Sequence, residues 1–363
     1  MSVPVARFVA SGPHLWAVSR CSMRRMANLA QITVRRGVDR AMFESEIVPT
    51  SLPVVLADLV ADWPVVRAAR ESRGALAREI RALDAGMLPH VIEAPATAAG
   101  RIFYRDDLAG FNFTRRAAGI SATLDRLLQL EHAAEPPALF MESVSTRSYL
   151  PGFARSHRMA LLDERVDPRM WIGNAVKVNT HFDLAHNIAC VVGGQRRFTL
   201  FPPEQIANLY LAPLDFTPSG APVSLVQFTA PDHSRFPRYA EALRHAMQVE
   251  LGPGDALFIP YGWWHHVESL TPLNVLVNYW WSNAPESGAP HGALLHAVLT
   301  IRDLPPDQRA VWQSIFQQLV FADPEQALGH LPPAQRGLLA PPSAERTKMI
   351  RDLLARDLNR SRE

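Results

Sequence analysis

Residues 171–183 read Trp171-Ile-Gly-Asn-Ala-Val-Lys-Val-Asn-Thr-His181-Phe-Asp183, and residues 251–266 read Leu251-Gly-Pro-Gly-Asp-Ala-Leu-Phe-Ile-Pro-Tyr-Gly-Trp-Trp-His265-His266. Side chains on a β-strand alternate between its two faces, so His181 and Asp183 would point the same way. A second strand, much later in the chain, would supply His265. Two imidazoles and one carboxylate form the facial triad of non-haem Fe(II) proteins. We therefore predict a metal centre whose ligands and catalytic residues are His181, Asp183 and His265.

The stretch from Met170 to Trp281 consists of short β-type runs separated by glycine and proline. These runs are Asn187–Val192, Arg197–Phe201, Ala256–Ile259 and Asn274–Trp280. Many short strands with such punctuation are typical of a double-sheet jelly roll. We predict a mainly β protein with helices, in which a double-stranded β-helix of the cupin type forms the core. Flanking N-terminal α/β elements and a C-terminal helical segment would complete it.

The chain divides by composition into three parts: a leader at 1–38, a catalytic domain at 39–285 and a helical segment at 286–363. The leader contains arginines but no acidic residue before Asp39, and we expect it to be disordered. Such a segment is typical of an organellar transit peptide. We favour the other interpretation, a disordered or over-extended start with Met23 or Met26 as alternative initiators.

Two further segments stand out within this division. Residues 210–246 form a long insertion with little periodicity, and such insertions in compact domains are usually functional or mobile. The C-terminal segment has apolar residues at helical spacing, and helices are expected at 293–301, 308–321 and 344–358. An apolar face around Trp312 and Phe316 would either pack on the barrel or form a homodimer interface.

The overall composition indicates a globular protein, because 48% of residues are hydrophobic and 20% are charged. Lys and Arg number 37 against 35 Asp and Glu, a balance that argues against a nucleic-acid-binding protein. Two cysteines, Cys21 and Cys190, cannot form a disulfide framework and fit a reducing compartment, so we expect a cytoplasmic location. No apolar run approaches the roughly 18 residues of a membrane span.

Several motifs give the sequence a family resemblance. They are His181-Phe-Asp183, Leu200-Phe-Pro-Pro203, Gly252-Pro-Gly-Asp255, Trp263-Trp-His-His266-Val-Glu-Ser-Leu270 and Val277-Asn-Tyr-Trp280. Together they resemble the JmjC, cupin-8-like branch of the Fe(II) and 2-oxoglutarate-dependent oxygenases, which includes the asparaginyl hydroxylase of hypoxia-inducible factor. The resemblance implies Fe(II) and 2-oxoglutarate as cofactors. It also implies a peptide, protein or small-molecule substrate that is oxidised while 2-oxoglutarate becomes succinate and CO₂.

The resemblance also assigns residues to the cofactor. Arg196 stands where the family has a lysine for the distal carboxylate of 2-oxoglutarate, and arginine offers that carboxylate a bidentate fork. Family asparagines near the metal correspond to Asn187 and Asn278, and Trp280 shares the strand face of Asn278. Lys177 has the same strand parity as His181 and is a second candidate cation. A family tyrosine that contacts 2-oxoglutarate aligns with a phenylalanine, Phe140.

The histidine next to His265 cannot share its role, because adjacent strand residues face opposite ways. The family motif places the ligand directly after Trp263-Trp264, which selects His265. We expect His266 to support or pack beside the site. His186 lies five residues beyond His181, and strand parity turns it to the other face.

Two alternatives to the oxygenase stay open at this point. One is a cupin that binds Zn or Mn without 2-oxoglutarate, and the other is a non-catalytic JmjC-like binding module. The complete triad favours catalysis, since degenerate modules typically lose a ligand. Hydroxylation and demethylation are not distinguished, because the substrate and not the triad decides between them.

Overall fold

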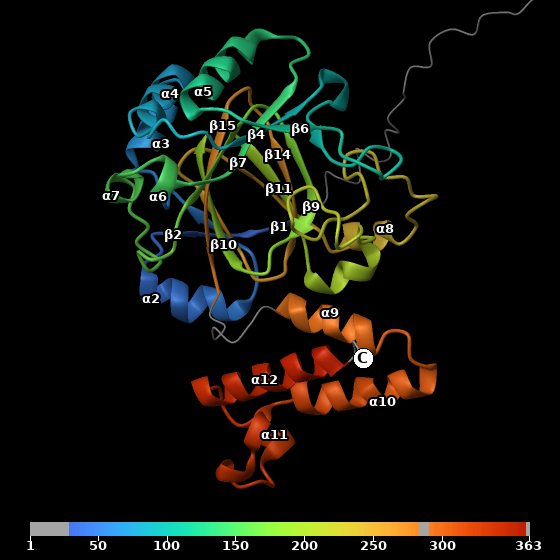
Figure 1. Cartoon of the computed structure of the whole chain (residues 1–363). Helices are drawn as coiled ribbons and strands as arrows, with labels where there is room; N and C mark the ends of the chain where they lie inside the picture. The colour runs from blue at the N-terminus through green and yellow to red at the C-terminus, as the bar shows by residue number, and fades with distance from the viewer. Residues whose placement is uncertain (1–28, 283–289, 361–363) are drawn as a thin grey trace, which may run out of the picture. The chain divides into compact units, whose positions relative to one another are not determined.

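The computed structural model describes residues 29–282 and 290–360. The described residues form two compact units, which lie within residues 1–282 and 283–363. Every strand of the described residues belongs to the first unit, and the second is helical (Figure 1). Among the described residues, no helix is both long and apolar enough to cross a bilayer.

Eight strands of the first unit form a jelly roll of two facing sheets. One sheet contains, in spatial order, β13 (Ala256–Ile259), β10 (His186–Gly193), β15 (Asn274–Trp281) and β8 (Arg169–Gly173). The other contains β12 (Met247–Leu251), β11 (Arg196–Phe201), β14 (Trp264–Ser269) and β9 (Lys177–Phe182). All pairings among these neighbours are antiparallel. The predicted double-stranded β-helix, mainly β with flanking helices, is therefore confirmed.

Further strands extend both sheets. The first gains β2 (Thr33–Arg36), β3 (Val54–Ala57), β4 (His90–Ala94), β6 (Thr114–Ala117) and β7 (Ala138–Ser145), and the second gains β1 (Ala30–Gln31) and β5 (Arg101–Ile102). β1 and β2 correct one expectation, since they lie inside the 1–38 segment that we expected to be disordered. They pair in parallel with β12 and β3, and Ile32 between them is only 4% exposed. Such distant pairings leave no local pattern in the sequence. Residues 1–28 of the expected leader lie outside the described residues.

Strands β10, β13 and β15 of the jelly roll are buried on both faces along most of their length, because both faces are covered. On β10, Ala189 and Val191 face the core between the sheets, whereas Ile188, Cys190 and Val192 face the helices. On β15, Leu276 faces the inter-sheet core in the same way. Strand alternation thus fixes which side chains reach the interior of the jelly roll.

Helices cover the outer face of the larger sheet. The longest are α3 (Pro64–Glu71), α4 (Arg73–Arg81) and α5 (Ile120–Gln129), with shorter helices α2 (Arg40–Met42), α6 (Thr146–Tyr149) and α7 (Phe153–Ser156) nearby (Figure 1). Pro64 begins α3 at a position where its missing N–H costs nothing. The Ser72 side chain accepts a hydrogen bond from the Ala75 N–H and so caps α4.

The insertion covers the outer face of the smaller sheet. A 3₁₀ segment, Pro203–Asn208, precedes it, and the insertion itself contains one short helix, α8 (Tyr239–Arg244), after a stretch of irregular chain. Phe228 and Tyr239 pack there against Trp264, whose side chain points away from the interior of the jelly roll. This segment therefore has its own small core despite its lack of periodicity.

The second unit consists of α9 (Pro290–Thr300), α10 (Pro306–Phe316), α11 (Pro324–Leu328) and α12 (Ala344–Arg360). A π-helical turn, Gln317–Phe321, extends α10. When the π-helical turn is counted with α10, the three long helices begin and end within about three residues of the helices expected from the sequence.

Candidate metal centre

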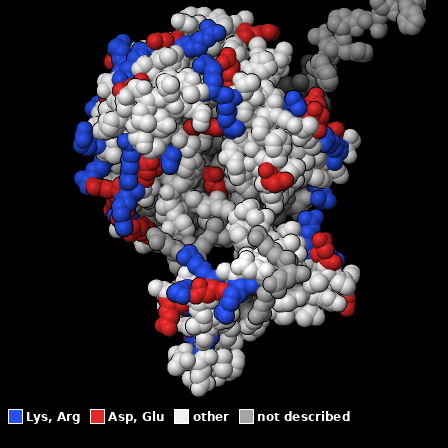
Figure 2. Space-filling model, in the orientation of Figure 1, with Lys and Arg blue, Asp and Glu red and all other residues white. Residues whose placement is uncertain are grey.

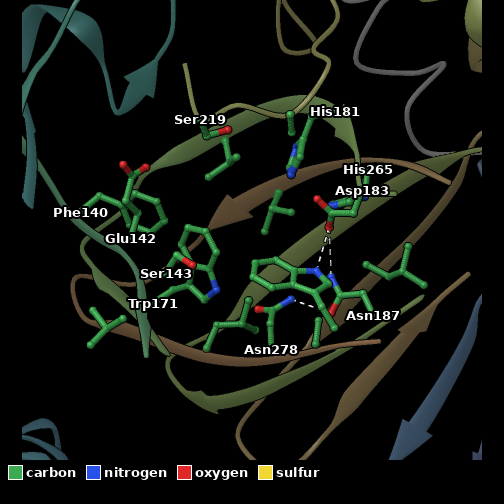
Figure 3. A pocket seen from close by; sticks show the side chains of 18 of the residues that line it. Phe140, Glu142, Ser143, Trp171, His181, Asp183, Asn187, Ser219, His265 and Asn278 are labelled. Atoms are coloured by element: carbon green, nitrogen blue, oxygen red, sulfur yellow. Dashed lines mark hydrogen bonds and ion pairs between the residues drawn. The ribbon is translucent and has the colours of Figure 1, made fainter. Parts of the chain in front are cut away.

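The jelly roll places two histidines opposite each other on neighbouring strands. His181 on β9 is the cross-strand partner of His265 on β14, and their ring centroids are 4.2 Å apart. Asp183 follows directly after β9, and its Oδ2 lies 3.7 Å from His265 Nε2. One ligand atom from each of the three residues lies within 4.8 Å of the others (Figure 3). The structure thus brings together all three residues that the sequence singles out.

Backbone carbonyls orient both imidazoles. His181 Nδ1 is 2.8 Å from the carbonyl oxygen of Asn179, and His265 Nδ1 is 3.1 Å from that of Trp263. A ring nitrogen that donates its proton to a carbonyl leaves the other nitrogen with a free lone pair. Both Nε2 atoms are therefore available to a metal ion.

A hydrogen-bond chain holds the carboxylate of Asp183. Trp280 Nε1 donates to Asp183 Oδ2 at 3.0 Å, and Asn187 Nδ2 donates to the same oxygen at 3.5 Å. Asn278 Nδ2 in turn donates to Asn187 Oδ1 at 2.7 Å. The three residues that the family resemblance assigned near the metal therefore lie beside the triad and position its carboxylate (Figure 3).

Burial keeps the second imidazole neutral. His265 is only 4% exposed. Burial lowers the pKa of its imidazole well below the ordinary value, and the nearby His181 lowers it further, while Asp183 opposes the shift. A neutral imidazole is the form that binds a metal ion. The site is thus preset for metal binding at neutral pH.

The triad opens into a cavity of about 440 Å³ between the two sheets. Its walls are mostly apolar, from Val178, Phe198, Ile259, Val267 and Leu276. Arg196 reaches this cavity from β11 and is 2% exposed. Its Nε and Nη2 atoms have no hydrogen-bond partner, and no ion pair with a carboxylate is found for it in the described residues.

Arg196 remains a cation in this setting. Burial lowers the pKa of its guanidinium to about 9, so it is protonated at neutral pH. A buried charge without a partner is costly, whereas a bound carboxylate would supply the missing acceptors. Arg196 therefore fits the role of a carboxylate ligand, at the position where the resembling family has a lysine.

Lys177 lies outside the metal cavity, contrary to our expectation. His181 is opposite His265, whereas Lys177 is opposite Glu268, and one extra residue of β9 lies between the two pairs. This β-bulge shifts the alternation of side chains by one position. Val178, next to Lys177, therefore lines the cavity, and Lys177 projects from the opposite face. The assumption of equal parity was wrong because it required an unbroken strand.

The other two histidines near the triad face away from it. His266 is buried on the outer face of the sheet and stacks on Phe228, with ring centroids 4.5 Å apart. Burial lowers the pKa of its imidazole to about 3. His186 Nδ1 accepts a hydrogen bond from the Tyr261 N–H at 3.2 Å. Both placements agree with the parity argument.

Sequence reasoning missed several residues of the cavity wall. Glu142 and Ser143 lie there because the pairing of β7 with β8 changes register between Met141 and Val144. Ser143 has φ of 50°, an uncommon backbone conformation for a non-glycine residue. Ser219 comes from the insertion, and no sequence pattern indicated it. Trp171 was not predicted as a site residue, although its Nε1 is buried beside the cavity without a partner.

A jelly roll with two histidines and an aspartate directed into its interior defines the cupin class of proteins. The family model described as "Cupin-like domain" matches residues 40–287. The chain therefore belongs to the cupin-like domain family, and the predicted family resemblance is confirmed.

The chain is also similar to several named proteins over part of its length. It is 38% identical over 122 residues to the lysine-specific demethylase JMJ31 of Arabidopsis thaliana, covering 32% of this chain and 22% of the relative. It is 39% identical over 113 residues to human HSPB1-associated protein 1, covering 31% and 22%. It is 31% identical over 176 residues to Jumonji C domain-containing protein 5 of Drosophila melanogaster, covering 48% and 41%. The match thus spans less than half of each relative.

The hydrogen bond from Trp280 to Asp183 generates a test of the proposed ligand set. We expect Trp280→Phe to weaken metal binding by roughly 10- to 100-fold, because an outer partner of a ligating carboxylate is lost. Calorimetric titration with Mn(II), a redox-stable probe, measures this affinity. Trp281→Phe is the matched control, since Trp281 packs on the opposite face of the same strand. Equal affinities for the two variants would contradict the assignment.

Proposed function

We propose that this chain is an Fe(II) and 2-oxoglutarate-dependent oxygenase that hydroxylates a protein side chain, a peptide or a small molecule. The observation that carries the proposal is Arg196, a buried guanidinium without a partner that lines the same cavity as the His181, Asp183 and His265 cluster. A metal-binding cupin that does not bind an organic acid has no need for such a cation. The cupin-like family and the JmjC names of its relatives support the same proposal.

Each group in the cavity has a task in this proposal. His181, Asp183 and His265 would hold Fe(II) and leave positions open for ligands. When bound, Fe(II) and 2-oxoglutarate supply the oxidative decarboxylation that yields succinate and CO₂ and is coupled to oxidation of the substrate. Arg196 would bind the distal carboxylate through its two free N–H groups. Trp171 Nε1, the other buried donor without a partner in this wall, would donate to an oxygen of the same ligand.

The remaining walls would control water and substrate. The apolar side chains Val178, Phe198 and Leu276 limit the water that can reach the reacting atoms. Glu142, Ser143 and Ser219 provide polar groups at another part of the wall (Figure 3), where a substrate could hydrogen-bond. Glu142 also accepts a hydrogen bond from Arg115 at 2.8 Å, which holds its carboxylate in place.

The proposed activity is tested by succinate formation. Anaerobically purified protein receives Fe(II), ascorbate and 2-oxoglutarate, and then O₂. Many oxygenases of this type turn over slowly without their prime substrate, so we expect succinate above background. His181→Ala and Asp183→Ala should abolish it and retain the circular dichroism spectrum of the folded protein. His186→Ala is the matched control, because this histidine is close in sequence but does not line the cavity.

Failure of this assay has distinct meanings. Turnover that survives both ligand variants would overturn the triad. Neither succinate nor 2-oxoglutarate binding in the wild type would instead favour a cupin that works without 2-oxoglutarate, or a non-catalytic binding module. Metal analysis of the purified protein separates those two.

A second prediction concerns the distal carboxylate of 2-oxoglutarate, which Arg196 would bind. We expect Arg196→Gln to raise the KM for 2-oxoglutarate by roughly 10- to 100-fold, since it removes charge-assisted hydrogen bonds. Arg196→Lys should restore part of the affinity because it restores the charge. Arg197→Gln is the control, as this neighbour faces outward and pairs with Glu250 and Glu268. A KM that is unchanged in Arg196→Gln would exclude the proposed role.

We also propose a homodimer formed through the C-terminal helices. Within the helical unit, exposed apolar side chains recur along the helices, namely Leu294, Leu295, Leu299, Val311, Trp312, Ile315, Leu319, Val320, Phe321, Met349, Leu353, Leu354 and Leu358. Apolar patches of this extent usually mark interfaces, and most closed homo-oligomers are two-fold dimers. Light scattering on full-length protein should give twice the chain mass. Phe321→Glu with Val320→Glu should halve it, and a monomeric wild type would disprove the proposal.

The location of the protein is a further proposal. Cys190 is free and fully buried among apolar side chains, which suits a reducing compartment and supports a cytoplasmic location. Subcellular fractionation checks this directly, and recovery of the protein in an organellar fraction would contradict it.

A further inference from the structure

A second group of polar side chains lies on the outer face of the smaller sheet, behind the metal centre. Because side chains alternate, His266 points outward from β14 while His265 points inward. Lys177 points outward from β9, on the far side of the β-bulge, and Arg101 extends from the edge strand β5. These three residues, together with Asn179, surround a small hollow of about 10 Å³, enough for about one water molecule.

His266 is an unusual component of this hollow. It is 3% exposed, and neither of its ring nitrogens has a hydrogen-bond partner. A buried polar group without a partner is costly, and most such groups in native proteins are satisfied by protein, water or ligand. Its position therefore indicates that something polar occupies this side of the sheet.

The hollow shares lining residues with a larger cavity. Arg101, Phe103 and Gln227 line both. The larger cavity has a volume of about 280 Å³ and is enclosed by residues 101–108 on one side and 225–236 of the insertion on the other. We call the two together the outer pocket. None of its lining residues lines the 440 Å³ metal cavity.

Positive charge in the outer pocket is only partly compensated. Arg101, Arg105 and Arg235 line the larger cavity, together with the acidic residues Asp106 and Asp232, and Arg105 forms an ion pair with Asp107 at 3.5 Å. The carboxylate of Asp232 is already engaged, since it accepts hydrogen bonds from the Ser234 N–H and hydroxyl and from the Arg235 N–H. The Asp232 carboxylate is therefore already engaged in hydrogen bonds within its own turn.

Arg101 is the cation best placed to bind a ligand. It is half-buried, and its Nη1 donates to Gln227 Oε1 at 3.1 Å. No carboxylate lies within ion-pair distance of it in the described residues, and Asp106 acts on it only at longer range. A half-buried guanidinium keeps several N–H donors in a fixed fork that matches the oxygens of a carboxylate or phosphate.

We propose that the outer pocket binds a small oxyanion, a phosphate or carboxylate group, with Arg101 as its main ligand and Arg235 as a second. The volume suits a small metabolite or inorganic ion and is below that of typical drug-sized sites. Lys177 adds positive charge at the inner end, and His266 offers a neutral hydrogen-bonding group there. The inner end of the pocket lies on the face of the smaller sheet opposite the metal centre, since the adjacent residues His265 and His266 face opposite sides of β14.

Calorimetric titration of the full-length chain tests this proposal. The probes are inorganic phosphate and succinate, each added at constant ionic strength because exposed charges are screened by salt. We expect one saturable site for at least one probe, and the comparison of the two identifies the preferred oxyanion. Arg101→Gln should weaken binding at least about tenfold through loss of a charge-assisted contact. Arg235→Gln should weaken it less.

Two control variants show whether the oxyanion binds in the outer pocket or elsewhere on the protein. Arg196→Gln removes the cation of the metal cavity, and with it any binding of succinate there, so binding of phosphate in the outer pocket should stay intact. Arg197→Gln removes one charge from the same outer sheet face without touching the pocket, and it should also leave binding intact.

Three results would overturn the proposal. They are no saturable binding of either probe, phosphate binding that is lost in Arg196→Gln but kept in Arg101→Gln, and equal weakening by Arg101→Gln and Arg197→Gln. Circular dichroism checks that Arg101→Gln is folded. If it is not, Arg235→Gln decides the question, because Arg235 is exposed: unchanged affinity there counts against the pocket, and reduced affinity supports it.

Discussion

The candidate metal centre depends on one register, the pairing of β9 with β14 that sets His181 opposite His265. A shift of one residue in either strand would turn one imidazole to the outer face. The register is held because β14 is buried on both sides and β9 is partly buried along its length. Val178 and Val267 contribute to the interior, and Trp264 packs under the insertion on the outside. The geometry of three ligands is thus a consequence of packing along two whole strands.

Some polar side chains in the interior have hydrogen-bond partners within the protein, and others do not. Asp183 accepts from Trp280 and Asn187, and Asn187 accepts from Asn278, so the carboxylate is held without a ligand, although Asn278 Oδ1 itself has no partner. Arg196 is different, because two of its nitrogens have no acceptor. A protein that tolerates an unpaired buried cation gives up stability for it. The unpaired group, more than the paired ones, points to ligand binding.

The sequence predicted the jelly roll and the ligand cluster because both have short-range signatures. His181 and Asp183 are two residues apart, and the glycine and proline spacing marks the strands. It failed where structure depends on distant partners. The face of Lys177 is set by a bulge against β14, and the strand at Thr33–Arg36 exists only beside β3. Ser219 reaches the cavity from an irregular loop, whose path follows from side-chain packing and not from periodicity.

The insertion connects the two cavities physically. Ser219 and Ala221 line the metal cavity, whereas Gln227 and Arg235 line the outer pocket. Between them, Val223 forms a bridge with His181 itself. A change in the path of this segment would therefore act on a proposed metal ligand and on both cavities together. Since loops vary more readily than the strands that they cover, this segment is where a cupin of this kind can acquire a new substrate without altering its ligand register. Figure 2 shows one face of the first unit, on which acidic side-chain atoms lie within a hollow that is surrounded mostly by uncharged side chains.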